Sequence, residues 1–210
     1  MLAPELEKYI DDHSNVQDDV LIEIERSTHL HTMSPQMLSG RIQGKLLTLL
    51  VSLANAQNVL EIGTFTAYGT VCLAKGLTTS GSKVVTIEAN PEYAYLVKKH
   101  IELSGLEDKI ETVIGDARKV IPERTEQWDV VYIDAHKQEY IEYYETVLAY
   151  VRPGGLILSD NVLWNGKVVF EPGNVDAKLI NRYNAMLRDD PRVDVVILPI
   201  RDGLSVARKK

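Results

Sequence analysis

From about residue 56 onward, short apolar runs alternate with segments of helical spacing. The runs with strand character are residues 58–62, 83–87, 110–114, 129–133 and 156–158. Apolar residues recur every three to four positions in the segments between them, notably at 68–77, 91–103 and 137–150, which is the period of a helix with one buried face. This alternation predicts parallel strands joined by right-handed helical crossovers.

The two ends of the chain depart from this alternation. Residues up to about 55 have a helical pattern, in which Ser34 is a candidate N-cap, Pro35 suits the first helical position, and apolar residues recur from Leu46 to Leu53. A further helix is expected at about 175–188. The strand-like stretches "RVDVVILPI" and "GLSVARK" then follow, separated only by Arg201-Asp202, so these two strands must pair antiparallel. The predicted fold is an α/β, Rossmann-like sheet, mostly parallel with a C-terminal antiparallel hairpin, preceded by N-terminal helices.

Length and composition narrow the class of protein. The 210 residues suit one domain, with residues 1–55 as a helical cap on an α/β core of residues 56–210. A formal net charge of -7 argues against a nucleic-acid partner. The lone Cys72 cannot form an internal disulfide, which favours a reducing compartment. No stretch reaches the roughly 20 apolar residues of a membrane span, and the acidic N-terminus "MLAPELEKYIDD" is unlike a signal peptide. We therefore expect a soluble cytoplasmic protein.

The stretch "VLEIGTFTAYGT" at residues 59–70 connects the first predicted strand to a helix. Gly63 permits a sharp turn and a close approach to the backbone, and open α/β sheets bind nucleotide-like ligands in such loops. An ordinary strand-to-helix turn has the same pattern. The Walker motif is missing, and so is the G-x-G-x-x-G fingerprint, because five residues separate Gly63 from Gly69. A pyrophosphate cofactor such as NAD or FAD is therefore disfavoured.

Glu88 ends the next predicted strand, where an acidic side chain can accept hydrogen bonds from both ribose hydroxyls. A ribose site without a pyrophosphate site indicates a nucleoside cofactor, and S-adenosylmethionine fits. Its carboxylate suits the backbone N–H groups of residues 63–69, and its ammonium suits either Glu61 or Asp134. The alternative for Glu88 is a solvated charge at the end of a strand.

Polar side chains also end the later strands. "WDVVYIDAHKQEY" places Asp134 at one strand end, and "GGLILSDNVLW" places Asp160 and Asn161 at the next. Both ends open on the same edge of a doubly wound sheet, and Lys137 lies within reach of that edge. Two carboxylates and an amide oxygen form a hard, oxygen-only set that suits Mg²⁺, Mn²⁺ or Ca²⁺ rather than zinc, although such residues are also common turn formers.

Three stretches, "LEIGTFTAYG", "IDAHKQEY" and "SDNVLWNGKVV", resemble the metal-dependent O-methyltransferases that include the catechol and caffeoyl-CoA enzymes. The likeness extends from "MLSGRIQGKLL" to "RDGLSVARK" and so covers nearly the whole chain. It implies a seven-stranded methyltransferase sheet, S-adenosylmethionine as cofactor, a divalent metal bound at Asp134, Asp160 and Asn161, and a homodimer. Lys137 matches the general base of the catechol branch, so Lys137 and Asp134 are the expected catalytic residues.

The same resemblance, together with the loop pattern, gives a set of cofactor contacts. They are Glu61, Gly63 and Thr64 at the methionine half, Glu88 at the ribose, Asp116 and Ala117 at the adenine, Met37 and Ser39 over the cofactor, and Tyr68, Gly69, Asp134 and His136 nearby. Trp164 is either a wall of the aromatic substrate site or a core indole. The other histidines show no ligand spacing and are interpreted as surface or helix residues, namely His13, His29, His31 and His100.

The chain departs from the family pattern at two places. Residues 66–69 read Thr-Ala-Tyr-Gly where relatives usually have Thr-Gly-Tyr-Ser, so Thr70 or a backbone N–H must replace the serine hydroxyl. The segment after "WNGKVVFEPG" is shorter than in the plant enzymes, where it helps to hold the CoA ester. The expected reaction is methyl transfer to a hydroxyl of a small catechol-like or caffeoyl-type aromatic. The alternatives are a tRNA hydroxyuridine methyltransferase and a non-catalytic nucleoside-binding module, and an NAD-dependent oxidoreductase is the rival enzyme class.

Overall fold

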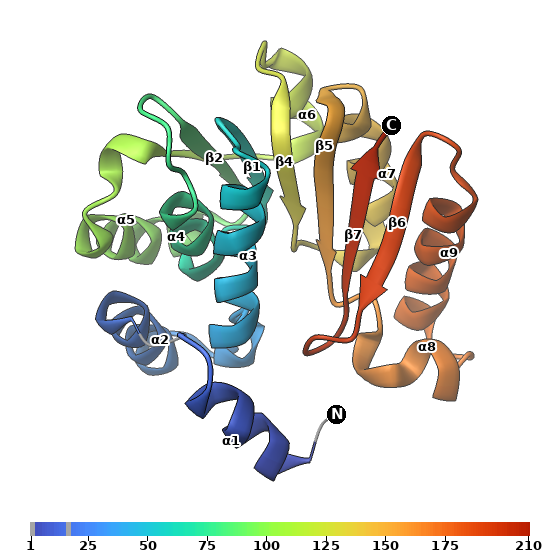
Figure 1. The fold of residues 1–210 in the computed structure, drawn as a ribbon, viewed down its shortest axis with the longest axis horizontal. Helices are drawn as coiled ribbons and strands as arrows, with labels where there is room; N and C mark the ends of the chain where they lie inside the picture. Colours follow the sequence, from blue (N-terminus) through green and yellow to red (C-terminus); the bar gives the residue numbers. More distant parts are fainter. Residues whose placement is uncertain (1–2, 16–17) are drawn as a thin grey trace.

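The computed structural model describes residues 3–15 and 18–210. Its centre is a seven-stranded sheet with the strand order β3-β2-β1-β4-β5-β7-β6 (Figure 1). The strands are β1 (Asn58–Ile62), β2 (Lys83–Glu88), β3 (Ile110–Ile114), β4 (Trp128–Ile133), β5 (Val151–Asp160), β6 (Val193–Leu198) and β7 (Leu204–Lys209). Strands β1 to β5 pair in parallel, and β7 is antiparallel to both β5 and β6. The predicted mixed α/β sheet is confirmed.

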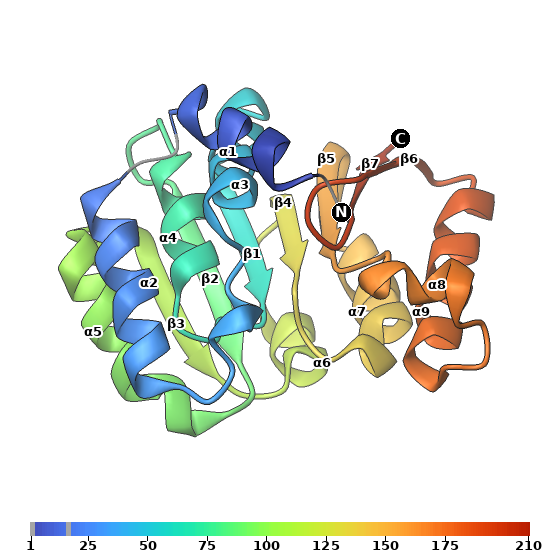
Figure 2. The same ribbon diagram turned by 90° about the horizontal axis from the view of Figure 1, so that it is seen from below.

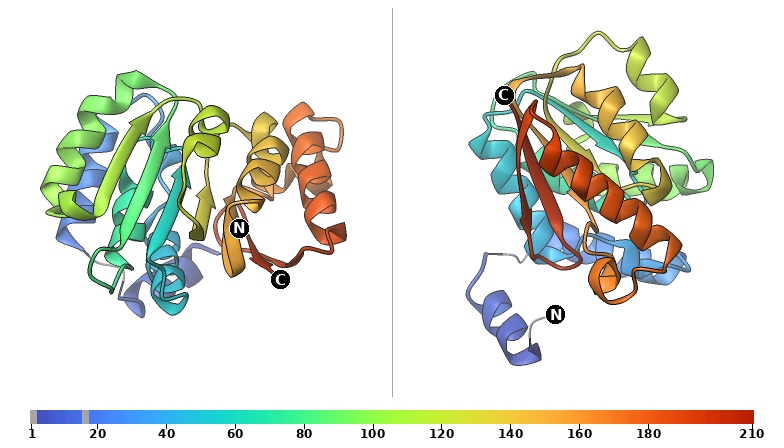
Figure 3. Two further views of the ribbon diagram at one scale, coloured as in Figure 1. Left: turned by 90° about the horizontal axis from the view of Figure 1, so that it is seen from above. Right: turned by 90° about the vertical axis from the view of Figure 1, so that its right-hand side faces the viewer.

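Helices cover both faces of this sheet (Figures 2 and 3). Strand residues alternate between the two faces, so Val59 packs in one apolar cluster with α3 and α4, whereas its neighbour Leu60 packs in the other with α7. Both faces are therefore buried, which explains the apolar strand runs. The helices are α1 (Pro4–Asp12), α2 (Asp19–His31), α3 (Arg41–Leu53), α4 (Tyr68–Lys75), α5 (Ala94–Ser104), α6 (Ala117–Val120), α7 (Tyr140–Leu148), α8 (Lys167–Phe170) and α9 (Val175–Asp189).

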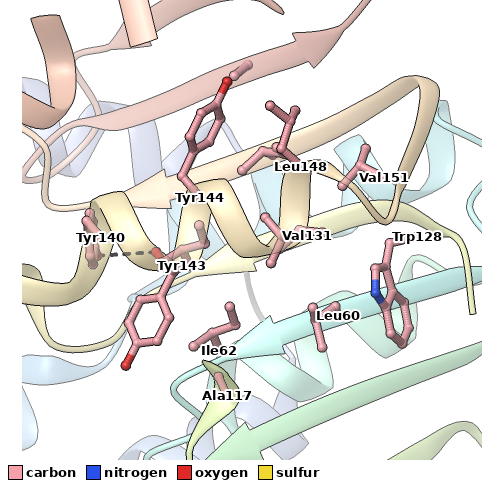
Figure 4. Close-up of a cluster of buried hydrophobic side chains, with 14 of the residues drawn as sticks. Leu60, Ile62, Ala117, Trp128, Val131, Tyr140, Tyr143, Tyr144, Leu148 and Val151 are labelled. Atoms are coloured by element: carbon pink, nitrogen blue, oxygen red, sulfur yellow. Dashed lines mark hydrogen bonds between the residues drawn. The ribbon is translucent and has the colours of Figure 1, made fainter. Parts of the chain in front are cut away.

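The larger cluster lies between the sheet and helices α7 and α9. Figure 4 shows side chains of α7 packed against those of the central strands, among them Tyr143, Tyr144, Leu148, Leu60, Ile62 and Val131. Trp128 and Tyr183 are also buried in this cluster. This core fixes the ends of β4 and β5, where the polar residues of the candidate site begin.

The start of α3 differs from the sequence prediction. The Ser34 side chain makes no capping hydrogen bond, and Pro35–Met37 forms only a short 3₁₀ turn. The α-helix begins at Arg41, after Gly40 with its left-handed φ of 74°. The prediction of a helix capped by Ser34 is therefore wrong at this end, because the chain turns at Gly40 before it becomes helical. The residues before Gly40 form a loop that contributes to the pocket described below.

Strand β5 is longer than predicted, because the stretch "RPGG" within it hides the strand pattern. The register between β4 and β5 shifts between Trp128 and Val130, and a bulge of this kind tolerates proline and glycine inside a strand. A methyl group at Gly155 would lie 3.0 Å from the Asp129 carbonyl oxygen, so the close approach of the two strands requires glycine there.

Two of the predicted helices are confirmed, but each begins with a 3₁₀ turn. The Asn90 side chain caps the start by accepting a hydrogen bond from the Glu92 N–H, but Pro91–Tyr93 is a 3₁₀ turn that precedes α5. Lys137–Glu139 is likewise a 3₁₀ turn before α7. Across residues 3–15 and 18–210, no helix is long and apolar enough to cross a membrane.

Candidate active site

A pocket opens at the carboxyl ends of β1 and β4. Its walls come from the loop before α3, from β1 and the β1–α4 loop, from the start of α4, and from β4. The lining residues are Met37, Leu38, Ser39, Glu61, Gly63, Thr64, Phe65, Tyr68, Gly69, Tyr132 and Asp134. Most of the predicted cofactor residues therefore meet here, whereas Glu88, Asp116, Ala117 and His136 lie outside the lining.

The two glycines of the loop are required by close contacts. Gly63 has a φ of 96°, and a methyl group there would lie 2.1 Å from the Asp134 carbonyl oxygen, so only glycine lets the ends of β1 and β4 approach each other. A methyl group at Gly69 would lie 2.7 Å from Glu61 Oε1. Gly69 therefore leaves one oxygen of the Glu61 carboxyl uncovered on the side of the pocket.

Glu61 is a buried carboxyl with one occupied and one open oxygen. Its Oε2 accepts hydrogen bonds from Thr86 Oγ1 at 2.6 Å and from Thr70 Oγ1. Among the residues that the structure describes, no hydrogen bond reaches Oε1. Burial raises the pKa of Glu61 to about 8 despite the two threonine hydroxyls. A buried carboxyl that faces a pocket without a cationic partner fits a positively charged ligand group.

Glu88 is held at the other side of the β1–α4 loop. Its Oε2 accepts the Phe65 N–H and its Oε1 accepts the Asn90 N–H, each at 2.8 Å. Both bonds fix the orientation of the carboxylate, and each oxygen keeps a lone pair for another donor. Thr64 contributes to the same framework, because its hydroxyl lies 2.5 Å from that of Thr86.

Asp160 and Asp134 come together around the Tyr132 hydroxyl. Asp160 is fully buried, and its Oδ2 accepts hydrogen bonds from Gln43 Nε2 at 2.6 Å and from Tyr132 OH at 3.0 Å. The Asn161 N–H donates to the other oxygen at 2.7 Å. The same Tyr132 hydroxyl is 3.5 Å from Asp134 Oδ2. Burial and the charge of Asp134 raise the pKa of Asp160 to about 6.

This donor set fits a hard divalent cation. Asp134, Asp160 and Asn161 offer only oxygen ligands, and a nearby cation would offset the repulsion between the two carboxylates. Asn161 has a left-handed φ of 56°, so the chain turns directly after Asp160. No cluster of three or more His, Cys, Asp or Glu side chains suited to a metal occurs in the described part of the chain. The set would supply three ligands, so a six-coordinate cation held by it would keep coordination positions for water or substrate.

Lys137 lies beside these carboxylates. Its Nζ donates to Asp134 Oδ1 at 3.2 Å and to the Tyr140 hydroxyl at 2.5 Å, and it lies 4.7 Å from the centre of the Tyr140 ring. The Tyr140 hydroxyl in turn donates to the Asp160 carbonyl oxygen at 3.0 Å. Tyr140 therefore links the Lys137 amine to the end of β5.

Three residues of this arrangement were missed by the sequence reasoning, namely Gln43, Tyr132 and Tyr140. A weak signal exists for two of them, because Tyr132 precedes Asp134 by two positions on the same face of the strand and Tyr140 follows Lys137 by three positions. Gln43 is a buried glutamine on α3, and nothing in its local sequence indicates a partner.

Other predicted residues lie further from the pocket. The Asp116 side chain caps α6 and binds the Arg118 guanidinium, while Ala117 is buried in the core. His136 is exposed and Trp164 is half-buried, with a left-handed φ of 49°.

His100 is a buried helix residue. Its Nδ1 lies 2.8 Å from the Thr66 carbonyl oxygen, and its Nε2 lies 2.8 Å from Ser27 Oγ. Burial lowers its pKa. It therefore connects α2 and α5 to the β1–α4 loop.

The seven-stranded mixed sheet, with helices on both faces and a pocket at its carboxyl edge, has the fold of the α/β methyltransferases. The family model described as O-methyltransferase matches residues 11–210, and the chain belongs to this family. A catechol O-methyltransferase of Niastella koreensis is 34% identical over 96% of this chain and 95% of its own length. Caffeoyl-CoA O-methyltransferase 2 of Petunia hybrida is 34% identical over 82% of this chain and 76% of its own.

A solved structure agrees with these relatives. The O-methyltransferase from Bacillus cereus in complex with SAH has a TM-score of 0.84 and 33% sequence identity, and the match covers 98% of this chain and 97% of that chain. The resemblance inferred from the sequence motifs is therefore confirmed. The protein is an S-adenosylmethionine-dependent O-methyltransferase.

Proposed function

We propose that this enzyme methylates one hydroxyl of a vicinal pair on a small aromatic ring, with the help of a divalent cation held by Asp134, Asp160 and Asn161. One observation carries the proposal: two carboxylates share the Tyr132 hydroxyl next to the Lys137 amine, at the edge of the pocket. The names of the Niastella and Petunia relatives support an acceptor of the catechol or caffeoyl type.

The cofactor residues receive the following roles in this proposal. Glu61 Oε1 binds the ammonium group of S-adenosylmethionine, because it is the open oxygen of a buried carboxyl. Glu88 accepts the ribose hydroxyls, and the backbone N–H groups of the β1–α4 loop bind the carboxylate. Met37 and Ser39 cover the cofactor together with Gly63, Thr64, Tyr68 and Gly69. Ala117 and Asp116 border the adenine, and His136 lies at the solvent-exposed side of the cofactor.

The protein groups then prepare the acceptor for reaction. When bound, S-adenosylmethionine supplies an electrophilic methyl group, and Mg²⁺ makes adjacent hydroxyls more acidic. Lys137 accepts the proton of the hydroxyl that is to be methylated. Tyr140 holds Nζ in place, while Gln43 and Tyr132 hold the Asp160 carboxylate. Trp164 borders the aromatic ring of the acceptor.

Removal of the cation tests this proposal. Excess EDTA is expected to abolish turnover of a catechol, because the cation lowers the pKa of the hydroxyl that reacts, and Mg²⁺ or Mn²⁺ to restore it. S-adenosylmethionine binding, measured by isothermal titration calorimetry, should persist, because its proposed contacts Glu61 and Glu88 are not ligands of the cation. Asp160→Asn should reproduce the loss, and Asp108→Asn at an exposed position is the matched control. Full activity in EDTA would show that the two carboxylates serve only the structure.

The acceptor class can be tested in one assay that offers catechol, caffeate, caffeoyl-CoA and undermodified tRNA. The net charge of -7 favours a small aromatic over a polyanion. Methylation of tRNA alone would contradict the proposal. We also propose a homodimer, by resemblance to the family, and light scattering at micromolar concentration measures it directly.

A further inference from the structure

The β6–β7 loop, residues 199–203, lies beside the candidate cation ligands. Leu204 at the start of β7 pairs with Asp160, so the loop adjoins the end of β5 (Figure 1). Two backbone hydrogen bonds fix it to the turn after Asn161: the Leu163 N–H donates to Asp202 O at 2.8 Å, and the Val162 N–H donates to Gly203 O at 3.1 Å. The loop is therefore a fixed wall at this edge.

Arg201 extends from this wall toward the loop before α3. A methyl group at Gly40 would lie 3.6 Å from both Cδ and Nε of Arg201, so the arginine side chain lies against Gly40. The neighbouring Ser39 lines the pocket and lies 3.3 Å from the Tyr132 hydroxyl through its own Oγ. Arg201 therefore spans the rim between the cation ligands and the cofactor side of the site.

The guanidinium of Arg201 has no acidic partner within residues 3–15 and 18–210, since none of their carboxylates lies within 4.0 Å of it. The adjacent Asp202 carboxylate accepts the Asn165 N–H instead. Arg41, on the other side of Gly40, is paired with Glu25 at 3.5 Å. Arg201 is thus the exposed, unpartnered charge of this rim.

We infer that Arg201 determines acceptor specificity by binding a carboxylate on the aromatic acceptor. This inference rests on the proposed function. The two hydroxyls of a catechol would face the cation ligands and Lys137, so a substituent on the far side of the ring would emerge at the rim. A guanidinium binds a carboxylate through two parallel hydrogen bonds. Catechol acids are therefore preferred to neutral or cationic catechols.

Three probes with the same catechol group test the inference: 3,4-dihydroxybenzoate, 4-methylcatechol and dopamine. Arg201→Gln should raise KM for the acid by about tenfold, the scale of one lost charge-assisted interaction, and leave 4-methylcatechol unchanged within about twofold. Arg201→Glu should lower KM for dopamine, because the sign of the rim charge is reversed. Binding of the acid at equilibrium, measured by calorimetry, should weaken by the same factor as KM rises.

Arg188→Gln is the matched control, since Arg188 is an exposed arginine at the far end of α9 that pairs with the neighbouring Asp189. The ratio of acid to neutral acceptor is measured within each variant and does not depend on the amount of folded enzyme. An unchanged ratio in Arg201→Gln would overturn the inference while the proposed function stands. Failure of the wild-type enzyme to methylate any of the three probes would overturn both.

Discussion

Lys137 is positioned by two neighbours, the Tyr140 hydroxyl at 2.5 Å from its Nζ and the Asp134 carboxylate at 3.2 Å. The lysine side chain is only 11% exposed, so few conformations are open to it. We predict that Lys137→Ala lowers kcat by about 10²-fold, the usual effect of losing an acid–base group. KM for S-adenosylmethionine should change little, because the lysine contacts the acceptor side. Steady-state kinetics of Lys137→Ala beside Lys98→Ala, an exposed lysine on α5, measures the effect. Equal kcat values for the two variants would exclude Lys137 as the base.

Glu61 makes cofactor binding dependent on pH. Its carboxyl has a pKa of about 8 before a cation is bound, so ionisation costs free energy below that pH. We predict that the affinity for S-adenosylmethionine rises as the pH increases from about 6 toward 8. Glu61→Gln should bind roughly tenfold more weakly and lose this dependence. Calorimetric titrations at several pH values test it, and a Kd that is constant with pH in the wild type would contradict it.

At the scale of elements, the contact between α3 and α4 depends on a glycine. A methyl group at Gly44 would lie 2.7 Å from Cys72 Sγ and 3.1 Å from a ring carbon of Tyr68. Alanine favours a helix over glycine by about 1 kcal/mol, but overpacking costs about 1–3 kcal/mol. Because the buried neighbours leave little room to move, the cost should exceed the gain.

We therefore predict that Gly44→Ala lowers the free energy of unfolding by about 1 kcal/mol, measured by urea denaturation. Gly173→Ala is the control, since a methyl group there would have no atom within 4 Å. Tyr68 also lines the pocket, so the same variant should weaken cofactor binding. A stabilised Gly44→Ala would show that α3 can shift away from α4.

At the scale of the whole molecule, Asp129 connects the N-terminal helices to the sheet. Its Oδ2 accepts the N–H groups of Gln57 and Asn58 at 2.8 Å each, and its Oδ1 accepts from the Arg152 guanidinium. Arg152 also donates to the Ala54 carbonyl oxygen at 3.3 Å. Burial opposes ionisation of Asp129, but the Asn58 N–H and Arg152 outweigh it and hold its pKa below the usual value.

The pKa of Asp129 is lower in the folded protein than in the unfolded protein, where it is about 3.9. Ionised Asp129 therefore stabilises the fold at pH values above the unfolded pKa. The contribution is lost as the pH falls through the lower pKa of the folded protein. We predict that Asp129→Asn lowers the free energy of unfolding by about 1–3 kcal/mol at neutral pH. Its difference from the wild type should shrink in acid. Denaturation at several pH values measures this difference, with Asp108→Asn as the exposed control. A difference that does not change with pH would contradict the assignment.

Much of this protein could be predicted from its sequence, because parallel strands buried on both faces leave apolar runs that are visible in the chain. The same runs located Asp134, Asp160 and Asn161 at strand ends. The predicted ends of helices and strands were wrong where backbone geometry, and not the hydrophobic pattern, determines them. Examples are Gly40 before α3 and the "RPGG" bulge of β5.

Only the tertiary structure brought distant residues into contact. Gln43 and Asp160 are 117 positions apart and share a hydrogen bond of 2.6 Å, which exists because α3 packs over the carboxyl edge of the sheet. Arg201 meets Gly40 for a related reason, since β7 inserts beside β5 and carries its loop to that edge. Periodicity reports whether a position is buried, but the partner of a buried polar group depends on how the elements pack. The sequence by itself determined the sheet and the acidic residues at its strand ends. The packing of the elements decided which side chains hydrogen-bond to those acids and placed Arg201 at the rim of the site.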